Sequence, residues 1–240
     1  MALPVMSTPT YTLVIPSTKK SVKYRPFLVK EEKAILIAQQ SEDIVTMVDT
    51  LKSVIQSCIL DKVDPDELAT FDLEYIFTQI RAKSVGETVE LLFPCDVDHG
   101  EQNDKAKVKI KIDLTKIEVE TPEDHTAKIE LFNNVGIVMK YPTIEVMSKL
   151  EKTDTDDLDN IFDIVAECVN YIYEGDKIHY AKEQKKAELI DFLGNLNSQQ
   201  FMKVQDFFST MPRIKKDVEY DCPICGKHHI KTLEGMQSFF

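Results

Sequence analysis

The sequence predicts an α+β fold, because hydrophobic residues recur with helical spacing in some stretches and alternate with polar residues in others. Residues 44–59 and 72–83 show the helical spacing, and residues 105–112 show the alternation of a half-buried strand. The third observation is Cys-Pro-Ile-Cys-Gly at 222–226, a pattern typical of a metal-binding hairpin. We expect an N-terminal hairpin and helices, a central antiparallel β region, and a C-terminal helical part closed by a zinc-ribbon-like hairpin.

The N-terminal hairpin is predicted from residues 11–15 and 21–25, which flank a turn-forming segment. Helices follow, the first indicated by Glu31 and Glu32 ahead of an apolar run. Ser41 and Asp72 are expected to cap the next two helices, since short polar side chains accept hydrogen bonds from the free N–H groups of a first helical turn. Cys58 lies on an apolar helical face and is expected in the core.

The central β region is predicted from strands at 88–93 and 105–112 and from a hairpin at 129–132 and 136–139. Lysines alternate along the second strand. A cationic face of this kind can contact phosphates, but in an acidic chain it more often solvates a sheet. A short helix is expected from Thr143 to Leu150.

The C-terminal part is predicted to be helical, with apolar faces over 158–172, 189–196 and 201–208 and with Cys168 in the core. Residues 218–220 and 230–232 flank the Cys-Pro-x-Cys turn as a last hairpin. The polar segment 151–157 is the expected boundary, so the chain divides into an α+β domain at 1–150 and a helical part with the hairpin at 151–240. The hairpin is expected to dock back on the first domain.

Composition excludes several functions. Lys+Arg 29 against Asp+Glu 41 gives a net charge of −12, which disfavours binding to nucleic acid or to an anionic membrane. No apolar run approaches the roughly 20 residues that cross a bilayer. The start of the chain lacks the features of a signal peptide, so we expect a reducing cytoplasm, where five cysteines are free thiols or metal ligands.

Zn²⁺ is the expected cofactor. Cys222 and Cys225 supply half of a tetrahedral site, and the loop with Cys95 and His99 is the best candidate for the other half. His228 or His229 is an alternative fourth ligand. The competing interpretation is a turn of the same shape that has lost its metal and is held by thiol hydrogen bonds.

A catalytic interpretation uses the same residues. His99 and Glu101 together with Cys222 and Cys225 loosely match the pattern of zinc deaminases, in which the glutamate is a general acid/base. Here the proline lies inside the cysteine pair, and the flanking segments are predicted strands rather than helix starts. A redox function of the Cys-x-x-Cys pair lacks the helical context that lowers a thiol pKa. We therefore expect no enzymatic activity.

The C-terminal tail carries Leu233, Met236, Phe239 and Phe240 at spacings of three and four residues. Two interpretations remain open. Either these side chains seal the core of the protein itself, or they dock into a groove on a partner protein.

Several stretches resemble one known family. They are residues 24–33 (YRPFLVKEEK), 72–87 (DLEYIFTQIRAKSVGE), 207–213 (FFSTMPR) and the C-terminal 233–240 (LEGMQSFF). Together with the Cys-Pro-x-Cys turn, they resemble the baseplate hub assembly proteins of T-even-like tailed bacteriophages. The resemblance implies a late, non-enzymatic protein of virion morphogenesis that contacts baseplate hub or tape-measure proteins. It leaves open whether the protein is an assembly chaperone in the host cytoplasm or a subunit of the virion baseplate.

Overall fold

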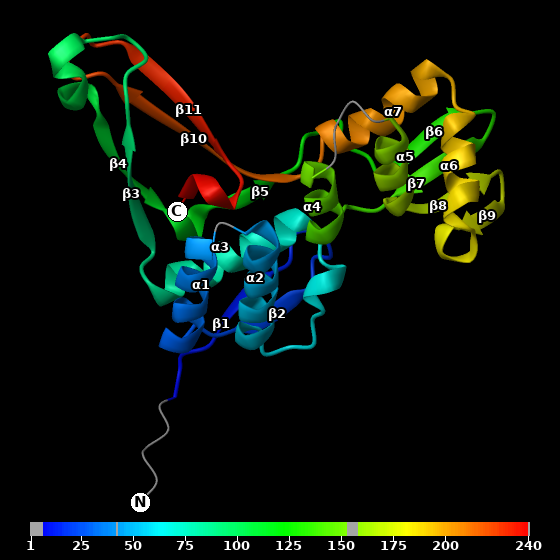
Figure 1. The fold of residues 1–240 in the computed structure, drawn as a ribbon, viewed down its shortest axis with the longest axis horizontal. Helices are drawn as coiled ribbons and strands as arrows, with labels where there is room; N and C mark the ends of the chain where they lie inside the picture. Colours follow the sequence, from blue (N-terminus) through cyan, green and yellow to red (C-terminus); the bar gives the residue numbers. More distant parts are fainter. Residues whose placement is uncertain (1–6, 42, 153–157, 240) are drawn as a thin grey trace, which may run out of the picture. The chain divides into compact units, whose positions relative to one another are not determined.

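The chain divides into two compact units in the computed structural model, which describes residues 7–41, 43–152 and 158–239 (Figure 1). Unit 1 comprises Met1–Pro65, Phe71–Glu120 and Arg213–Phe240, and unit 2 comprises Asp66–Thr70 and Thr121–Pro212. The chain therefore changes unit near residues 120 and 213 and not at the expected boundary of 150. The reason is strand pairing, because the last hairpin pairs with a strand that precedes residue 121.

The base of unit 1 is a two-stranded hairpin packed with three helices, as predicted. Its elements are β1 (Tyr11–Val14), β2 (Ser21–Tyr24), α1 (Val29–Ser41), α2 (Ile44–Cys58), the short helix η1 (Pro65–Glu67) and α3 (Thr70–Ser84). The apolar faces of α2 and α3 are buried, and Cys58 is fully buried among them as expected. The first helix differs, since α1 buries only Glu31 and Ala38 of its described side chains.

Two predicted helix caps are wrong. Ser41 ends α1, and α2 is capped by Asp43, whose carboxylate accepts a hydrogen bond from the N–H of Thr46. Asp72 lies inside α3, fully buried. Its carboxylate accepts hydrogen bonds from the N–H of Ser17 (2.9 Å) and from the Ser17 hydroxyl. Asp72 thus holds the β1–β2 turn on α3, a tertiary role that a local capping pattern does not reveal.

The rest of unit 1 is a pair of long hairpins with the short segments that follow them, which together we call the hairpin arm, residues 88–120 and 213–239. Its elements are β3 (Thr88–Phe93), η2 (Gly100–Ala106), β4 (Val108–Asp113), η3 (Leu114–Lys116), β5 (Glu118–Glu120), β10 (Arg213–Asp221), β11 (His228–Glu234) and η5 (Met236–Phe239). β3 pairs with β4, and a separate sheet has the order β11-β10-β5. The two hairpins run beside each other (Figure 1) and share one apolar cluster that includes Phe93, Ile214 and Phe239.

Unit 2 is an antiparallel sheet of order β6-β7-β8-β9 packed with helices. Its elements are β6 (Lys128–Phe132), β7 (Val135–Met139), α4 (Ile144–Lys152), α5 (Leu158–Glu167), β8 (Val169–Glu174), β9 (Lys177–Tyr180), η4 (Ala181–Glu183), α6 (Lys186–Gly194) and α7 (Ser198–Ser209). The predicted helix 158–172 is wrong beyond residue 167, where the chain enters β8. Residues 169–172 are β-branched or aromatic in three of four positions, which favours a strand.

The core of unit 2 is one apolar cluster that joins the sheet to the helices. Ile137 of β7, Leu193 of α6 and Phe207 of α7 are almost completely buried in it, together with Cys168, as expected for that cysteine. Of the expected boundary segment 151–157, the first two residues end α4, and residues 153–157 lie outside the described residues. Among the residues that are described, no helix has the length and apolar character that a bilayer crossing requires.

Candidate metal centre

Four predicted ligands meet where the two hairpins of the arm end. Cys95 and His99 lie in the segment between β3 and β4, and Cys222 and Cys225 lie in the turn between β10 and β11. One donor atom from each of these four residues lies within 4.8 Å of every other. The sequence separation is more than 120 residues, so the fold alone brings the two halves together. This cluster can hold a metal ion.

The turn between β10 and β11 folds its backbone N–H groups back toward Cys222. The N–H of Ile224 donates to the sulfur of Cys222 at 3.4 Å, and the N–H of Gly226 donates to the carbonyl of Cys222 at 2.9 Å. Gly226 has a φ of +69°, a left-handed conformation that glycine adopts without strain. The Ile224 N–H points toward the sulfur, where it stabilises a thiolate, and the Gly226 N–H closes the turn.

The first loop repeats part of this geometry. The N–H of Val97 donates to the sulfur of Cys95 at 3.4 Å, as Ile224 does to Cys222. His99 is then fixed by Asn103, whose side-chain oxygen accepts the His99 N–H at 2.8 Å and whose amide nitrogen donates to Asp98 at 2.8 Å. Although its sequence departs from the Cys-Pro-x-Cys pattern, the loop presents one thiol and one imidazole toward the other hairpin.

The donor separations fit ligands of a common tetrahedral metal. Zinc–sulfur bonds of about 2.3 Å and zinc–nitrogen bonds of about 2.0–2.1 Å give tetrahedral edges of about 3.8 Å between two sulfurs and about 3.6 Å between sulfur and nitrogen. The sulfurs of Cys95 and Cys225 lie 3.9 Å apart, and the Cys222 sulfur lies 3.5 Å from Nε2 of His99. No large movement is needed to bind an ion.

The pKa values of the thiols also favour binding of a cation. Burial opposes ionisation of Cys222, but the N–H groups of Cys225 and Ile224 outweigh it and lower the pKa of this thiol to about 6. Burial raises the pKa of Cys95, opposed by the Val97 N–H and reinforced by the neighbouring Cys222 and Cys225 thiols. One thiolate therefore suppresses ionisation of its neighbour. A bound divalent cation removes that repulsion and displaces the protons.

Polar contacts outside the four ligands also join the two loops. Lys227 forms an ion pair with Asp96 at 2.8 Å, and the hydroxyl of Tyr220 donates to the carbonyl of Pro94 at 2.9 Å. Sequence reasoning missed these residues. Asp96 and Lys227 adjoin predicted ligands, so their opposite charges were an available signal, whereas the Tyr220 contact follows only from the packing of the two hairpins on each other.

The alternative ligands His228 and His229 and the candidate catalytic residue Glu101 occupy different positions relative to the four-residue cluster. His228 is exposed and contacts Asp221 at 2.8 Å, whereas Nε2 of His229 lies 3.3 Å from the Cys95 sulfur. His229 forms a second possible metal group with Cys95 and Asp96. Glu101 is exposed in η2 and belongs to neither group. An ion held by all four protein donors would have a complete tetrahedron, without the open position that the metal-bound water of a deaminase requires.

The C-terminal tail packs into unit 1. Leu233 and Phe239 are buried in the cluster of the hairpin arm, with Phe239 fully inaccessible, and Met236 is half-buried. This burial favours the interpretation in which the tail seals its own core. Docking of these three residues to a partner stays a prediction that requires the tail to leave the core. Phe240, the fourth predicted docking residue, lies outside the described residues.

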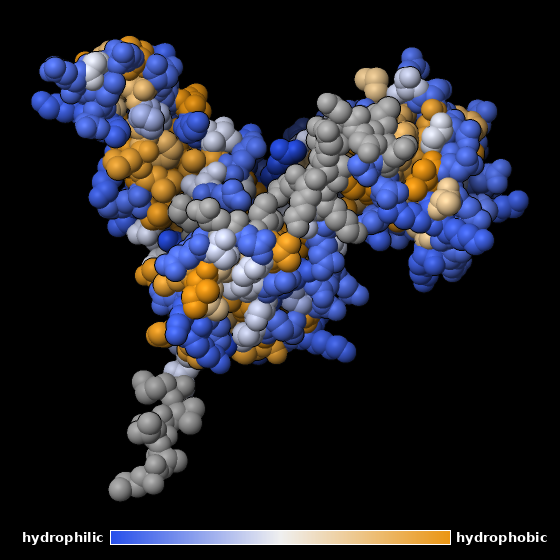
Figure 2. All heavy atoms as spheres, viewed as in Figure 1, coloured by the Kyte–Doolittle hydropathy of each residue, from blue (hydrophilic) through white to orange (hydrophobic). Residues whose placement is uncertain are grey.

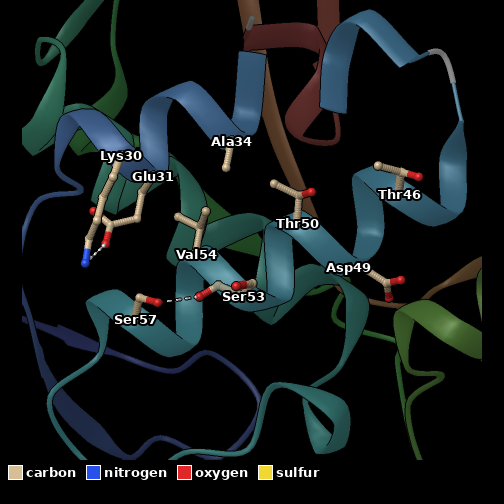
Figure 3. A pocket seen from close by; sticks show the side chains of 9 residues that line it. All are labelled: Lys30, Glu31, Ala34, Thr46, Asp49, Thr50, Ser53, Val54 and Ser57. Atoms are coloured by element: carbon tan, nitrogen blue, oxygen red, sulfur yellow. Dashed lines mark hydrogen bonds and ion pairs between the residues drawn. The ribbon is translucent and has the colours of Figure 1, made fainter. Parts of the chain in front are cut away.

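A groove of about 510 Å³ between α1 and α2 is the other candidate site (Figure 3). Short side chains of α2 line one wall, and the first half of α1 lines the other. Glu31, the buried carboxylate at its edge, is already paired with Arg25 at 3.0 Å. The groove thus contains small and paired groups and has no arrangement of nucleophile and base. Its lining residues are Lys30, Glu31, Ala34, Thr46, Asp49, Thr50, Ser53, Val54 and Ser57.

Comparison with known proteins identifies the family. The model of the family described as T4 bacteriophage base plate protein matches residues 8–240, nearly the whole chain. The chain therefore belongs to this family of phage baseplate proteins, and the resemblance found in the sequence is confirmed. No curated protein and no solved structure matched the chain. A protein of this family is part of the phage virion or of its assembly.

Proposed function

We propose that the protein is a non-enzymatic baseplate hub assembly factor or minor inner-baseplate subunit that acts by binding other phage proteins. The observation that carries the proposal is the family match over residues 8–240, which includes both units and the tail. Hub and tape-measure proteins are the partners that this role implies. Assembly would begin in the host cytoplasm.

We further propose that the cluster of Cys95, His99, Cys222 and Cys225 binds one structural Zn²⁺. Its support is the pair of N–H···S contacts at Cys95 and Cys222 and the separations of 3.9 Å and 3.5 Å between donors. The ion would join the ends of the two hairpins, where the apolar cluster of the arm does not reach. It would supply rigidity rather than chemistry, because protein donors fill its coordination sphere.

The surface of α1 supports a protein-binding role. This helix carries three strongly exposed apolar side chains: Val29 is 80% exposed, Leu36 53% and Ile37 55%. Figure 2 shows apolar side chains on the visible face over this helix. Exposed apolar side chains gathered in one place are typical of surfaces that other proteins cover.

The function is tested by removing the gene from its phage and supplying variants in trans. Loss of the protein should leave incomplete baseplates and no infectious particles, and the wild-type gene should restore both. Leu36→Asp with Ile37→Asp should fold but fail to restore assembly, whereas charge substitutions at the exposed residues Lys177 and Asp176 of unit 2 serve as the matched control. Normal baseplates without the gene would contradict the proposal.

Mass spectrometry of purified particles then separates the two forms of the proposal. A retained subunit gives peptides of this chain at fixed stoichiometry, and an assembly chaperone gives none although baseplates have formed. Either result keeps the assembly role and decides how it is performed.

A further inference from the structure

We propose that His229 holds the Cys95 thiolate by a hydrogen bond from Nε2–H, without binding the metal itself, and that this contact strengthens binding of the ion. The inference rests on the proposed zinc site and assigns a role to a residue outside the four ligands. The proposed role is to strengthen metal binding, which depends on the residues around the four ligands as well as on the ligands themselves.

The position of His229 is fixed by the strand that carries it. Adjacent residues of β11 point to opposite sides, so His228 and His229 cannot both face the cluster. His229 is opposite Tyr220 in β10, and the two rings stack with centroids 5.0 Å apart and an interplanar angle of 18°. The His229 side chain is only 10% exposed. The imidazole is thus held between Tyr220 and the loop of Cys95.

The atoms of His229 face two acceptors. Nε2 lies 3.3 Å from the sulfur of Cys95, and Nδ1 lies 3.7 Å from a carboxylate oxygen of Asp96. A metal-bound thiolate has no proton and only accepts hydrogen bonds, so the nitrogen facing it must carry one. Because 3.7 Å exceeds hydrogen-bonding distance, Asp96 does not fix the orientation of the ring, and the Nε2–H assignment rests on the contact with the sulfur.

Metal coordination by the four-donor cluster does not require His229. Its ring nitrogen is grouped with Cys95 and Asp96 and not with the other three ligands, which already complete a tetrahedron with Cys95. Three thiolates and one neutral imidazole around Zn²⁺ leave one net negative charge. Donors to sulfur reduce that charge, and Cys95 has two of them, the Val97 N–H at 3.4 Å and His229 at 3.3 Å.

The test replaces His229 with phenylalanine, which keeps a ring against Tyr220 but removes the N–H donor. His228→Phe is the matched control, because His228 points away from the cluster and contacts Asp221. Zn²⁺ affinity is measured by competition with a chelator, and coordination is followed by the absorption of bound Co²⁺. His229→Phe should bind Zn²⁺ about 10–100-fold more weakly with an unchanged Co²⁺ spectrum. His228→Phe should match the wild type in both.

Each other outcome is informative. A Co²⁺ spectrum that loses a nitrogen ligand in His229→Phe but not in His99→Phe would make His229 the fourth ligand and overturn the inference. Unchanged affinity would also overturn it while the metal site stands. Wild-type protein that takes up neither Zn²⁺ nor Co²⁺ would overturn the proposed site and this inference together. If the phenylalanine variant does not fold, His229→Leu provides the donor-free comparison.

Discussion

The hairpin arm of unit 1 and the sheet of unit 2 bury their apolar residues in different ways. In unit 2, helices α5, α6 and α7 contribute to the same cluster as strands β6, β7 and β8, so the sheet has a continuous cover. In the arm, the shared cluster includes Phe93 of β3 and Val218 of β10 but no residue of the loops that follow them. Beyond Val218, Tyr220 still packs against the cluster, with its ring centroid 5.4 Å from that of Phe93, and the loops touch through polar and sulfur atoms.

This difference in apolar burial shows where a cross-link adds stability to a fold. A strand pair that extends past its apolar core exposes polar backbone and gains little from burial. At that point the arm has the cluster of four side chains for which we propose metal binding, the Lys227–Asp96 ion pair and the Tyr220 hydrogen bond. Among the described residues of unit 2 there is no comparable group of metal-binding side chains. Its helices make one unnecessary.

The largest expected effect comes from removing one ligand. Cys222→Ser should abolish tight zinc binding and separate the ends of the two hairpins, because structural zinc contributes about 10–16 kcal/mol of binding free energy in zinc-finger peptides. Metal analysis and thermal unfolding measure the change. Cys168→Ser, in the core of unit 2, is the control that should keep the zinc. Equal zinc content in Cys222→Ser and wild type would break the distinction between the two regions.

The next effect concerns the core of unit 2. Phe207 is about 1% exposed and its ring lies 5.3 Å from His125 and 5.7 Å from Tyr141. Phe207→Ala should lower the free energy of unfolding by about 3–5 kcal/mol, as for other buried aromatics. Zinc content should not change. Chemical denaturation measures the loss, and a loss below about 1 kcal/mol would mean that this cluster does not stabilise the sheet.

The tail gives the matching test in unit 1. Phe239 is fully buried in the arm cluster, so Phe239→Ala should also cost about 3–5 kcal/mol and should loosen the arm. If the tail instead leaves the core to bind a partner, the substitution should spare folding and stop baseplate assembly. Unfolding curves and complementation of the phage distinguish these results.

A smaller expected effect is that the stabilities of the two units respond to pH in opposite directions. Burial raises the pKa of Glu74 in unit 1, opposed by the Met236 N–H. A raised carboxyl pKa contributes stability below the ordinary value of 4.5, and this stability is lost as pH rises through the folded-state pKa. Glu74→Gln should therefore stabilise unit 1 at neutral pH and have little effect near pH 4.

The contribution of His125 to the stability of unit 2 depends on pH with the opposite sign. Burial lowers its pKa, opposed by Asp124, while Thr210 and Tyr141 each bond one ring nitrogen at 3.0 Å. The hydroxyl of Thr210 donates to Asp206, so it accepts from Nδ1–H, and the Tyr141 hydroxyl donates to Nε2. This neutral state stabilises unit 2 above about pH 6.5, and the contribution is lost as pH falls through the lowered pKa. Acidification should weaken unit 2 while Glu74 favours unit 1, as followed by amide exchange in each unit.

Sequence periodicity predicted most of the elements, since the hairpins and the helical stripes depend on local spacing. The predictions failed where contacts between distant segments, rather than local spacing, decided the structure. The stretch 169–172 became β8 because it pairs with β7, and Asp72 became a buried anchor for Ser17 rather than a cap. The division into units could not be predicted, because it follows from the pairing of β10 with β5 across more than 90 residues.

The sequence indicated the four side chains that meet in the candidate site, whose role as ligands stays a prediction, but not the residues around them. Cysteine and histidine spacing indicates ligands because few other functions need that pattern. The choice between His228 and His229 depends on which side of β11 faces the loop, and that register is set by pairing with Tyr220. Asp98 and Asn103, which position His99, carry no pattern of their own.

Amide hydrogen exchange with and without a chelator tests the central claim most directly, namely that a metal ion joins the ends of the hairpin arm. Wild-type protein purified without chelator should contain about one zinc ion per chain, in accord with a single four-ligand site. Chelation should release the ion and remove protection from the ends of β3, β4, β10 and β11, while β7 and β8 of unit 2 keep theirs. Protein that contains no zinc, or an arm whose exchange is unchanged by the chelator, would contradict the account.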